Sequence, residues 1–374
     1  MQIHCPRQPA DERRVALTPD VVASLVQRGH SITVEHDAGR AAGFRDETYA
    51  DAGATVSGSG EHVTADLVVT VVDPGGDPGP AVLGLLDPFV RIERMHELAG
   101  AGVTVFAFEA VPRTTRAQVV DALSSQATTA GYQAVLIAAA RSARLFPMLT
   151  TAAGTIRPSK VVVLGAGVAG LQAIATARRL GAVVFGYDVR EAAAEQVESL
   201  GARFIRLDAT TDASDAGGYA RSLDDDAQQR IIDGLAPHLA DADVVVTTAA
   251  VPGRVAPCLI DDAGLANMQR GAVIVDLAAS AGGNTTRTDP GRDVDADGVV
   301  IVGATDLPGQ VAADSSRMYA RNVAAFVDLL GDDDGHFAPD WDDDIVAESC
   351  IAREGRIIHP RLATTEPEHT EETA

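Results

Sequence analysis

An apolar strand, a glycine-rich turn and an alanine-rich helix follow one another between residues 160 and 180. No other part of the chain constrains the fold as strongly. The turn has the spacing G-x-G-x-x-G, formed by Gly165, Gly167 and Gly170. A second apolar strand ends on Asp188, eighteen residues after the last glycine. This order of strand, helix and strand predicts a βαβ unit closed by an acid.

Each residue type in the turn suits the binding of a dinucleotide. Gly165 permits the tight turn, Gly167 lets a pyrophosphate approach the backbone, and Gly170 lets helix and strand pack closely. The first helical turn, with Val168 and Ala169, offers N–H groups and a partial positive charge to the phosphates. The motif therefore predicts a dinucleotide site, although a degenerate unit or one that binds S-adenosylmethionine remains an alternative.

The residues after the second strand indicate which dinucleotide fits. Asp188 can accept hydrogen bonds from both hydroxyls of the adenosine ribose, and it would repel a 2′-phosphate. NAD(H) is therefore favoured over NADP(H). Val189 and Arg190 follow it. An arginine here can accommodate a 2′-phosphate. Because Asp188 holds the strand-end position, we expect Arg190 to face solvent or to stack on the adenine.

Charge separates this chain from several functional classes. Its 374 residues carry a net charge of −23, from 53 acidic and 30 basic side chains. The acidic excess extends over the whole length, which predicts adaptation to high salt, because salt shortens the Debye length to ~3 Å at 1 M. Such a charge excludes nucleic-acid binding, which needs a basic surface.

Cysteine and histidine usage predicts no metal site and no disulfide. The three cysteines, Cys5, Cys258 and Cys350, lie far apart, and the histidines lack metal-ligand spacing. No apolar run approaches the ~18 residues of a membrane-spanning helix. The N-terminus lacks the pattern of a signal peptide. We therefore expect a cytoplasmic protein that does not itself insert into the membrane.

Strands and helices alternate, which predicts an α/β protein with two Rossmann-like lobes joined by long helices. We expect residues 1–125 and 330–374 to form the N-terminal lobe, and residues 126–329 to form a doubly wound parallel sheet that binds NAD(H). Long helices are expected over 115–145 and 315–330. Ile345–Val346 and Ile351–Ile358 are expected to be a strand pair that rejoins the first lobe.

Further motifs show a resemblance that covers residues 1 to 360. They are Glu12–Pro19, Pro112–Gln118, Asp121–Gln126, Ala130–Tyr132, Thr151–Gly154, Glu195–Gly201, Gly217–Tyr219, Thr247–Ala249, Asp276–Ala278 and Ala281–Asn284. With them the chain resembles the NAD(H)-binding subunits of proton-translocating transhydrogenases, in the alanine dehydrogenase/transhydrogenase family. It resembles the alanine dehydrogenases more distantly.

The resemblance implies roles for four residues around the nicotinamide ring. Arg113, Asp121 and Ser124 would hold the carboxamide and ribose of NAD(H), since a carboxamide needs a donor and an acceptor in fixed places. Gln118 would reach NADP(H) on a partner subunit. Without the resemblance, Arg113 and Asp121 would be read as a surface pair worth ~0–1 kcal/mol.

The resemblance also implies residues that line the cofactor site in the second lobe. Tyr219 belongs to a mobile loop that closes over the nucleotide, with an ordinary surface turn as the alternative. Thr248 and Ala249 end a strand at the site. Asp276, Leu277 and Asn284 belong to the next strand end and loop. The acid and the amide would contact the nicotinamide half or only order the loop.

Two positions separate the two relatives. Alanine dehydrogenases use a lysine and a histidine to bind and protonate the oxo-acid, where this chain has Thr70 and Leu85. The family's carboxylate-binding arginine, Arg14, is retained. Oxidative deamination needs a proton-transferring group, whereas hydride transfer between two nicotinamides needs placement and exclusion of water. These losses favour transhydrogenation.

The expected protein is a homodimer that gives hydride from NADH to NADP⁺ on an NADP(H)-binding beta subunit. Proton translocation would occur in membrane-embedded subunits, so this chain would lie at the inner face of the cell membrane. An amino-acid dehydrogenase of the alanine type and a non-catalytic NAD(H)-binding module are the alternatives.

Overall fold

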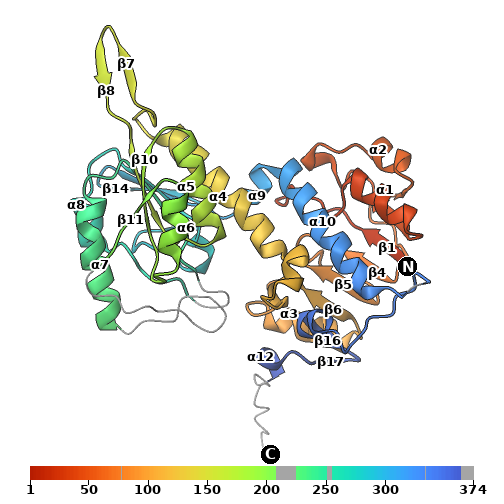
Figure 1. Ribbon diagram of the computed structural model, residues 1–374. Helices are drawn as coiled ribbons and strands as arrows, with labels where there is room; N and C mark the ends of the chain where they lie inside the picture. Colours follow the sequence, from red (N-terminus) through yellow and green to blue (C-terminus); the bar gives the residue numbers. More distant parts are fainter. Residues whose placement is uncertain (77, 208–224, 251–254, 333, 364–374) are drawn as a thin grey trace, which may run out of the picture. The chain divides into compact units, whose positions relative to one another are not determined.

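The computed structural model describes the chain except residues 77, 208–224, 251–254, 333 and 364–374. The chain divides into two compact units (Figure 1). Unit 1 comprises Met1–Gln126 and Gly309–Ala374, and unit 2 comprises Ala127–Pro308. Each unit has its own largely parallel sheet covered by helices. The predicted α/β class is therefore confirmed.

Unit 1 contains a sheet in the order β17-β16-β6-β5-β4-β1-β2-β3. The strands from β6 to β3 are parallel, whereas β16 pairs antiparallel with β6 and with β17. The C-terminal segment thus extends the sheet of the first lobe. The strands are β1 (Gln2–Cys5), β2 (Ser31–Glu35), β3 (Thr55–Ser57), β4 (Leu67–Val69), β5 (Ala81–Gly84), β6 (Thr104–Ala107), β16 (Cys350–Arg353) and β17 (Arg356–Ile357).

The helices of unit 1 cover this sheet and include the long α10. Tyr319 and Phe326 of α10 lie edge-on against Phe108, with ring centroids 5.4 and 5.7 Å apart. Because this apolar face of α10 packs on unit 1, the second segment of unit 1 begins at Gly309. The sequence had suggested that it begins at residue 330. The helices are α1 (Pro19–Gln27), α2 (Asp46–Asp51), α3 (Ile92–Gly100), α10 (Ala312–Leu330), α11 (Asp344–Ser349) and α12 (Pro360–Ala363), with 3-10 turns η1 (Arg40–Ala42), η2 (Phe108–Ala110) and η3 (Arg116–Val120).

Two predicted elements differ in the structure. Ile345 and Val346 lie in α11 and not in a strand, because the Asp343 side chain accepts hydrogen bonds from both of their N–H groups and starts a helix. The helix expected over residues 115–145 is instead η3 followed by α4 (Ala122–Arg141). The unit boundary falls within α4, between Gln126 and Ala127.

Unit 2 contains a sheet in the order β11-β10-β9-β12-β13-β15-β14. All neighbours are parallel except β14, which is antiparallel to β15. The strand order reverses between β9 and β12, so the predicted doubly wound sheet is confirmed. Sheets of this kind bind ligands at the carboxyl edge, at the point of reversal. The strands are β9 (Lys160–Leu164), β10 (Val183–Tyr187), β11 (Arg203–Phe204), β12 (Val244–Thr247), β13 (Val273–Asp276), β14 (Asp293–Ala296) and β15 (Val299–Gly303).

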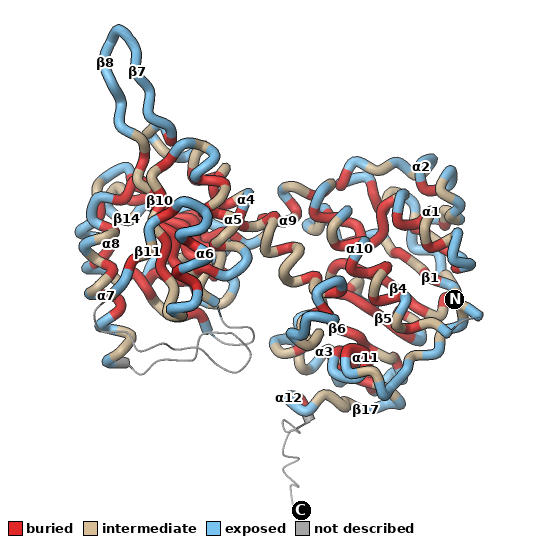
Figure 2. The backbone as a smooth tube through the Cα atoms, in the orientation of Figure 1, coloured by how far each residue is buried: buried red, intermediate tan, exposed pale blue. Residues whose placement is uncertain are grey.

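Helices bury both faces of this sheet, which explains its continuous apolar strands. Val161 and Val163 pack toward α5, whereas Val162 and Leu164 pack with residues of α7 and α8. Figure 2 shows the buried strands at the centre of the unit. The helices are α5 (Val168–Arg179), α6 (Ala193–Ser199), α7 (Asp225–Leu239) and α8 (Asp262–Asn267), with the 3-10 turn η4 (Ala279–Ala281). The short α9 (Leu307–Gln310) spans the boundary between the two units.

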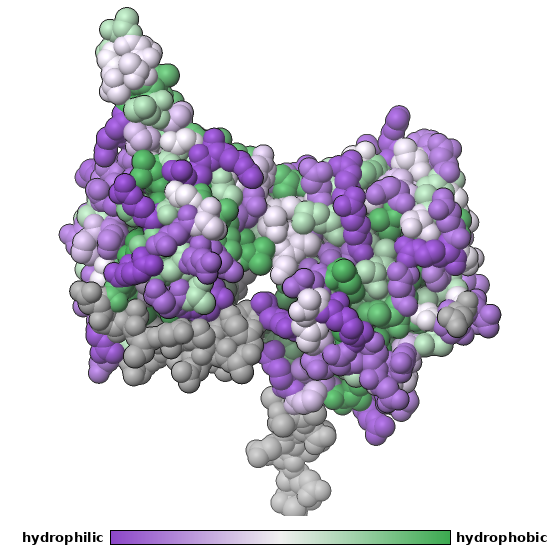
Figure 3. Space-filling view, viewed as in Figure 1, coloured by the Kyte–Doolittle hydropathy of each residue, from purple (hydrophilic) through white to green (hydrophobic). Residues whose placement is uncertain are grey.

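A separate hairpin projects from unit 2 (Figure 1). Its antiparallel strands are β7 (Leu149–Thr151) and β8 (Gly154–Ile156), and every residue of both is exposed. The sequence did not predict it as a strand pair. Met148, Leu149 and Ile156 are 65%, 42% and 45% exposed, and Figure 3 includes apolar residues along the projection.

Candidate functional site

The glycine turn follows β9 at the carboxyl edge of the unit 2 sheet. Gly165 has φ +97°, in the left-handed region that favours glycine. A Cβ atom added to Gly170 would lie 1.8 Å from the carbonyl oxygen of Gly165. A Cβ atom on Gly167 would meet no atom within 4 Å. Two glycines are therefore required by the backbone itself, while the third borders open space where a phosphate can approach.

The N-terminus of α5 is open to a ligand. Gly167 precedes the helix and has no side chain to cap it, and Val168 is 42% exposed. The first N–H groups of a helix have no partner within it, so those of Val168 and Ala169 suit an anion. Behind the turn, a Cβ atom on Gly131 of α4 would lie 2.0 Å from the Ala169 carbonyl oxygen. The sequence did not identify this close approach, although Gly131 lies in one of the family-like motifs.

Asp188 lies beside the turn, and its side chain is 6% exposed. It accepts hydrogen bonds from the Ala166 N–H at 2.7 Å and the Arg190 N–H at 3.0 Å. The Arg190 guanidinium adds bonds of 2.8 Å to each carboxylate oxygen. Burial would raise the pKa of Asp188, but the Arg190 guanidinium together with the N–H groups of Arg190 and Ala166 outweighs it, so the pKa lies below its ordinary value. Arg190 was expected to face solvent or adenine, but here it pairs with Asp188 because this buried carboxylate needs a counter-charge.

The end of β12 closes the turn from the other side. Thr248 Oγ1 donates to the Gly165 carbonyl at 3.0 Å, and the Thr248 N–H donates to Leu164 at 2.8 Å. The backbone N–H and carbonyl of Ala249 both bond to the side-chain amide of Asn284, at 3.1 and 2.7 Å. Thr248 and Ala249 therefore lie at the glycine turn, as the motif requires.

Asp276 and Asn284 order the loop after β13. The Asp276 carboxylate accepts from the N–H groups of Ala278 at 2.9 Å and Asn284 at 2.7 Å, and from the Thr288 hydroxyl at 2.7 Å. Both Asp276 and Asn284 are 0% exposed. Of the two roles considered for them, this network favours ordering of the loop.

The remaining predicted residues of unit 2 add little chemistry. Val189 and Leu277 are half-buried, and each packs against one of the two sheet cores. Tyr219 lies outside the described residues, as does the pair of glycines before it.

The residues expected around the nicotinamide lie in unit 1. Arg113 and Gln118 are exposed, whereas Asp121 and Ser124 are half-buried. Asp121 accepts from both the N–H and the hydroxyl of Ser124, at 2.9 and 2.6 Å. The pair therefore caps α4 as well as presenting polar atoms next to Gln118.

The η3 segment that carries Gln118 is held from both sides. Asn322 of α10 donates to the Val119 carbonyl at 2.9 Å, and Arg116 forms a bidentate pair with Asp343 at 2.6 and 2.8 Å. Sequence reasoning missed Asn322, because no local pattern distinguishes a polar residue on an amphipathic helix. The structure identifies Asn322 as a buried polar residue, 7% exposed, that bonds to the η3 backbone.

Thr70 and Leu85 have structural contacts and do not form an acid–base site. Thr70 is 0% exposed, bonds through its hydroxyl to Gln8 at 3.1 Å, and accepts the Tyr319 hydroxyl on its carbonyl at 2.6 Å. Leu85 packs against the core of unit 1. Neither side chain can transfer a proton.

Arg14 is retained but is already paired. Its guanidinium forms a bidentate contact with Glu12 at 2.9 and 2.6 Å and donates to Gln126 at 2.9 Å. Both members of the ion pair are less than a tenth exposed. An oxo-acid carboxylate would have to compete with Glu12 for this arginine.

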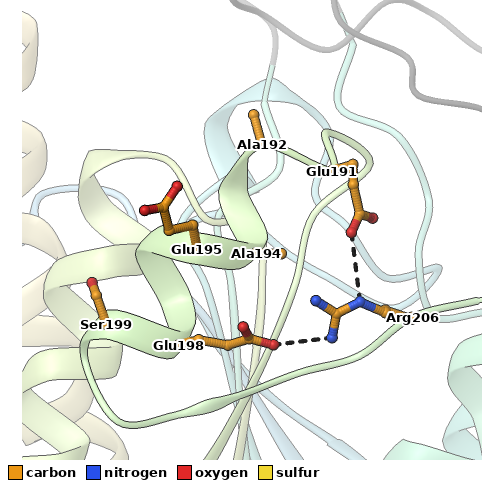
Figure 4. A pocket seen from close by; sticks show the side chains of 7 residues that line it. All are labelled: Glu191, Ala192, Ala194, Glu195, Glu198, Ser199 and Arg206. Atoms are coloured by element: carbon orange, nitrogen blue, oxygen red, sulfur yellow. Dashed lines mark hydrogen bonds and ion pairs between the residues drawn. The ribbon is translucent and has the colours of Figure 1, made fainter.

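A shallow hollow on α6 is distinct from the glycine turn (Figure 4). Arg206 lies between Glu191 and Glu198, 3.5 and 3.0 Å from their carboxylates, and Glu195 adds a further acid. This acidic lining would repel phosphates, so the hollow does not compete with the turn as the dinucleotide site.

Comparison with known proteins identifies the family. The model of the alanine dehydrogenase/PNT N-terminal domain matches residues 5–130, and that of the C-terminal domain matches residues 134–360. The chain belongs to the alanine dehydrogenase/PNT family. Its similarity to transhydrogenases supports an oxidoreductase-type role, and its solved relatives have the Rossmann-type fold of this NAD(H)-binding family.

The transhydrogenase branch of this family is the more similar. The first of the polypeptides that make up NAD(P) transhydrogenase subunit alpha in Rhodospirillum rubrum is 41% identical over 372 residues, covering 95% of this chain and 97% of the relative. The crystal structure of transhydrogenase from Sinorhizobium meliloti has a TM-score of 0.87 at 39% identity, covering 96% of this chain and 100% of that one. An L-alanine dehydrogenase structure has a TM-score of 0.80 at 26% identity, covering 97% and 98%. The predicted resemblance is confirmed.

Proposed function

We propose that this chain is the NAD(H)-binding subunit of a proton-translocating NAD(P)⁺ transhydrogenase. Hydride would pass directly between NADH on this chain and NADP⁺ on a partner subunit. The observation that carries the proposal is an intact dinucleotide motif in a chain whose Thr70 and Leu85 cannot transfer a proton. Similarity to transhydrogenase alpha subunits supports the same conclusion.

The residues at the carboxyl edge of unit 2 fit the phosphates and the adenosine half of NAD(H). The backbone around Gly167 and the N-terminus of α5 suit the pyrophosphate, and Asp188 suits the ribose. The Thr248 and Ala249 backbone, held by Asn284, would form the opposite wall of the site.

The unit 1 residues would orient the reactive end. When bound, the nicotinamide supplies the hydride chemistry. Arg113, Asp121 and Ser124 would hold its carboxamide and ribose, and Gln118 would reach toward the partner's nucleotide. Because transfer between two nicotinamides requires no protein acid, these residues only need to fix distance and exclude water. The capped start of α4 supports a fixed orientation of Asp121.

An alanine-type dehydrogenase is the alternative that Arg14 would favour. The Glu12 contact to Arg14 and the missing lysine and histidine argue against it. Steady loss of NADH absorbance with purified chain, pyruvate and ammonia would support the alternative. We expect none.

We further propose that the chain forms a homodimer and binds membrane-embedded subunits that carry the NADP(H) site, at the inner face of the cell membrane. Among the described helices, none is both long and apolar enough to span a bilayer. The exposed apolar side chains of the β7–β8 hairpin suit a contact between two copies. The net charge of −23 suits function in high salt.

Reconstitution tests this function. Purified chain in multimolar KCl is mixed with an NADP(H)-binding transhydrogenase subunit, and reduction of an NADP⁺ analogue by NADH is followed by absorbance. We expect NADH to bind the chain alone with little turnover, and hydride transfer to begin only when both subunits are present. Tighter binding of NADPH than of NADH, or NADH binding without any transfer in the mixture, would contradict the proposal.

A further inference from the structure

All acceptor positions of the Asp188 carboxylate are occupied. A carboxylate has about four lone-pair sites. The N–H groups of Ala166 and Arg190 take one site on each oxygen, at 2.7 and 3.0 Å. The Nε and Nη2 atoms of Arg190 take the other two, both at 2.8 Å.

The adenosine ribose of NAD(H) needs two of these positions. An acid at this strand end accepts a hydrogen bond from the ribose 2′-hydroxyl, and Asp188 can accept one from the neighbouring 3′-hydroxyl as well. These two N–H groups belong to the backbone, that of Ala166 in the glycine turn and that of Arg190 in the loop after β10, so neither can leave without a backbone rearrangement. The Arg190 guanidinium is the group that can move, because it ends a flexible side chain that is 25% exposed.

We infer that the Arg190 guanidinium occupies the positions on Asp188 that the ribose of NAD(H) requires. Binding of the dinucleotide therefore displaces it, and Arg190 sets both the affinity and the selectivity of the site. This inference rests on the proposed NAD(H)-binding function.

The same ion pair weakens discrimination against NADP(H). Asp188 repels a 2′-phosphate only while its charge is uncompensated. Paired with Arg190, the two side chains carry no net charge, and a displaced guanidinium would attract the phosphate. A chain without this arginine would bind NADH more tightly and reject NADPH more strongly.

Arg206 provides a matched control. It lies in the same unit and pairs with Glu198 of α6 and with Glu191, which precedes that helix, as Figure 4 shows. Its described partners do not include Asp188. Replacement of Arg206 by methionine removes the same unit of charge as Arg190→Met, but leaves the Asp188 pair intact. It therefore measures how much of any change comes from net charge alone.

The experiment is calorimetric titration of the full-length wild type, Arg190→Met and Arg206→Met with NADH and with NADPH. A pH of 8 keeps Asp188 ionised. Removing a charged competitor should tighten NADH binding by up to about tenfold in Arg190→Met. The substitution should also increase the dissociation constant for NADPH relative to the dissociation constant for NADH. Arg206→Met should match the wild type in both respects.

NADH binding by Arg190→Met that equals or falls below that of the wild type would overturn the inference. An equal gain in affinity in Arg190→Met and Arg206→Met would overturn it as well. Either result would leave the proposed function standing. Failure of the wild type to bind NADH would instead overturn the proposed function. Both changes at residue 190 remove the counter-charge of Asp188. Arg190→Gln, which keeps a polar side chain, is therefore titrated in parallel with Arg190→Met. In a crystal structure of the wild type with NADH, Arg190 should be found away from Asp188; retention of its bidentate pair would also overturn the inference.

Discussion

Asp121 accepts two hydrogen bonds from Ser124, one from the backbone N–H at 2.9 Å and one from the hydroxyl at 2.6 Å. These two residues, proposed to hold the nicotinamide end, therefore also form the start of α4. A capping carboxylate has a restricted orientation. The start of α4 thus also fixes the orientation of the Asp121 side chain in the proposed site.

We predict that Asp121→Ala lowers the free energy of unfolding by about 1 kcal/mol, because the first turn of α4 loses its cap. Asp121→Asn keeps an acceptor and should lose less. Urea unfolding followed by fluorescence of Trp341, the single tryptophan, measures this in unit 1. Wild-type stability of Asp121→Ala would show that the cap contributes nothing.

Asn322 should act on hydride transfer through the η3 segment. Its amide bonds to the Val119 carbonyl next to Gln118, so Asn322→Ala removes a restraint worth about 1 kcal/mol. We expect slower transfer to the partner's nucleotide with little change in NADH affinity. Arg321→Ala, an exposed change on the same helix, is the control. A wild-type rate in Asn322→Ala would contradict this role.

Alanine substitutions at two glycines of the turn should have different effects, one on stability and the other on NADH binding. Gly170→Ala forces a Cβ atom to 1.8 Å from the Gly165 oxygen, so the protein should be severely destabilised. At Gly167 nothing lies within 4 Å of a Cβ atom. Gly167→Ala should therefore keep the melting temperature while weakening NADH binding. Calorimetry gives both quantities, and undiminished NADH affinity in Gly167→Ala would argue against a pyrophosphate at this position.

Glu109 should make stability depend on pH. Burial raises the pKa of this carboxyl from 4.5 to about 7, although the Asp87 N–H bonds to it at 2.8 Å. The folded state then binds more protons than the unfolded state between these values, so stability falls as pH rises through them, by about 3 kcal/mol in all. Glu109→Gln should remove this dependence and be the more stable protein at pH 8. Urea titrations from pH 5 to pH 8 test it; parallel profiles for both proteins would refute it.

The β7–β8 hairpin should be needed for dimerisation. Leu149 and Ile156 expose apolar surface on two strands that pair only with each other among the described strands. We expect Leu149→Asp with Ile156→Asp to shift the protein from dimer to monomer in light scattering, with unchanged NADH binding. Thr150→Asp with Thr155→Asp adds the same charge without removing apolar groups and serves as control. A dimer that survives the first pair would place the contact elsewhere.

The local sequence determined the βαβ unit and its glycine turn. Strand and helix periodicity act over a few residues, and the left-handed φ of Gly165 and the close approach at Gly170 restrict those positions to glycine. The doubly wound sheet of unit 2 followed from the same alternation. These features could be predicted because short-range sterics and burial on both faces fix them.

Only the tertiary structure decided how distant or competing groups pair. The contact from Asn322 to Val119 joins residues 203 positions apart, and no periodicity reports such a partner. Asp188 and Arg190 are close in sequence, yet their pairing depends on burial of the carboxylate, which makes a counter-charge favourable. Long-range packing selects among local alternatives of similar energy, and these choices are not visible in the sequence.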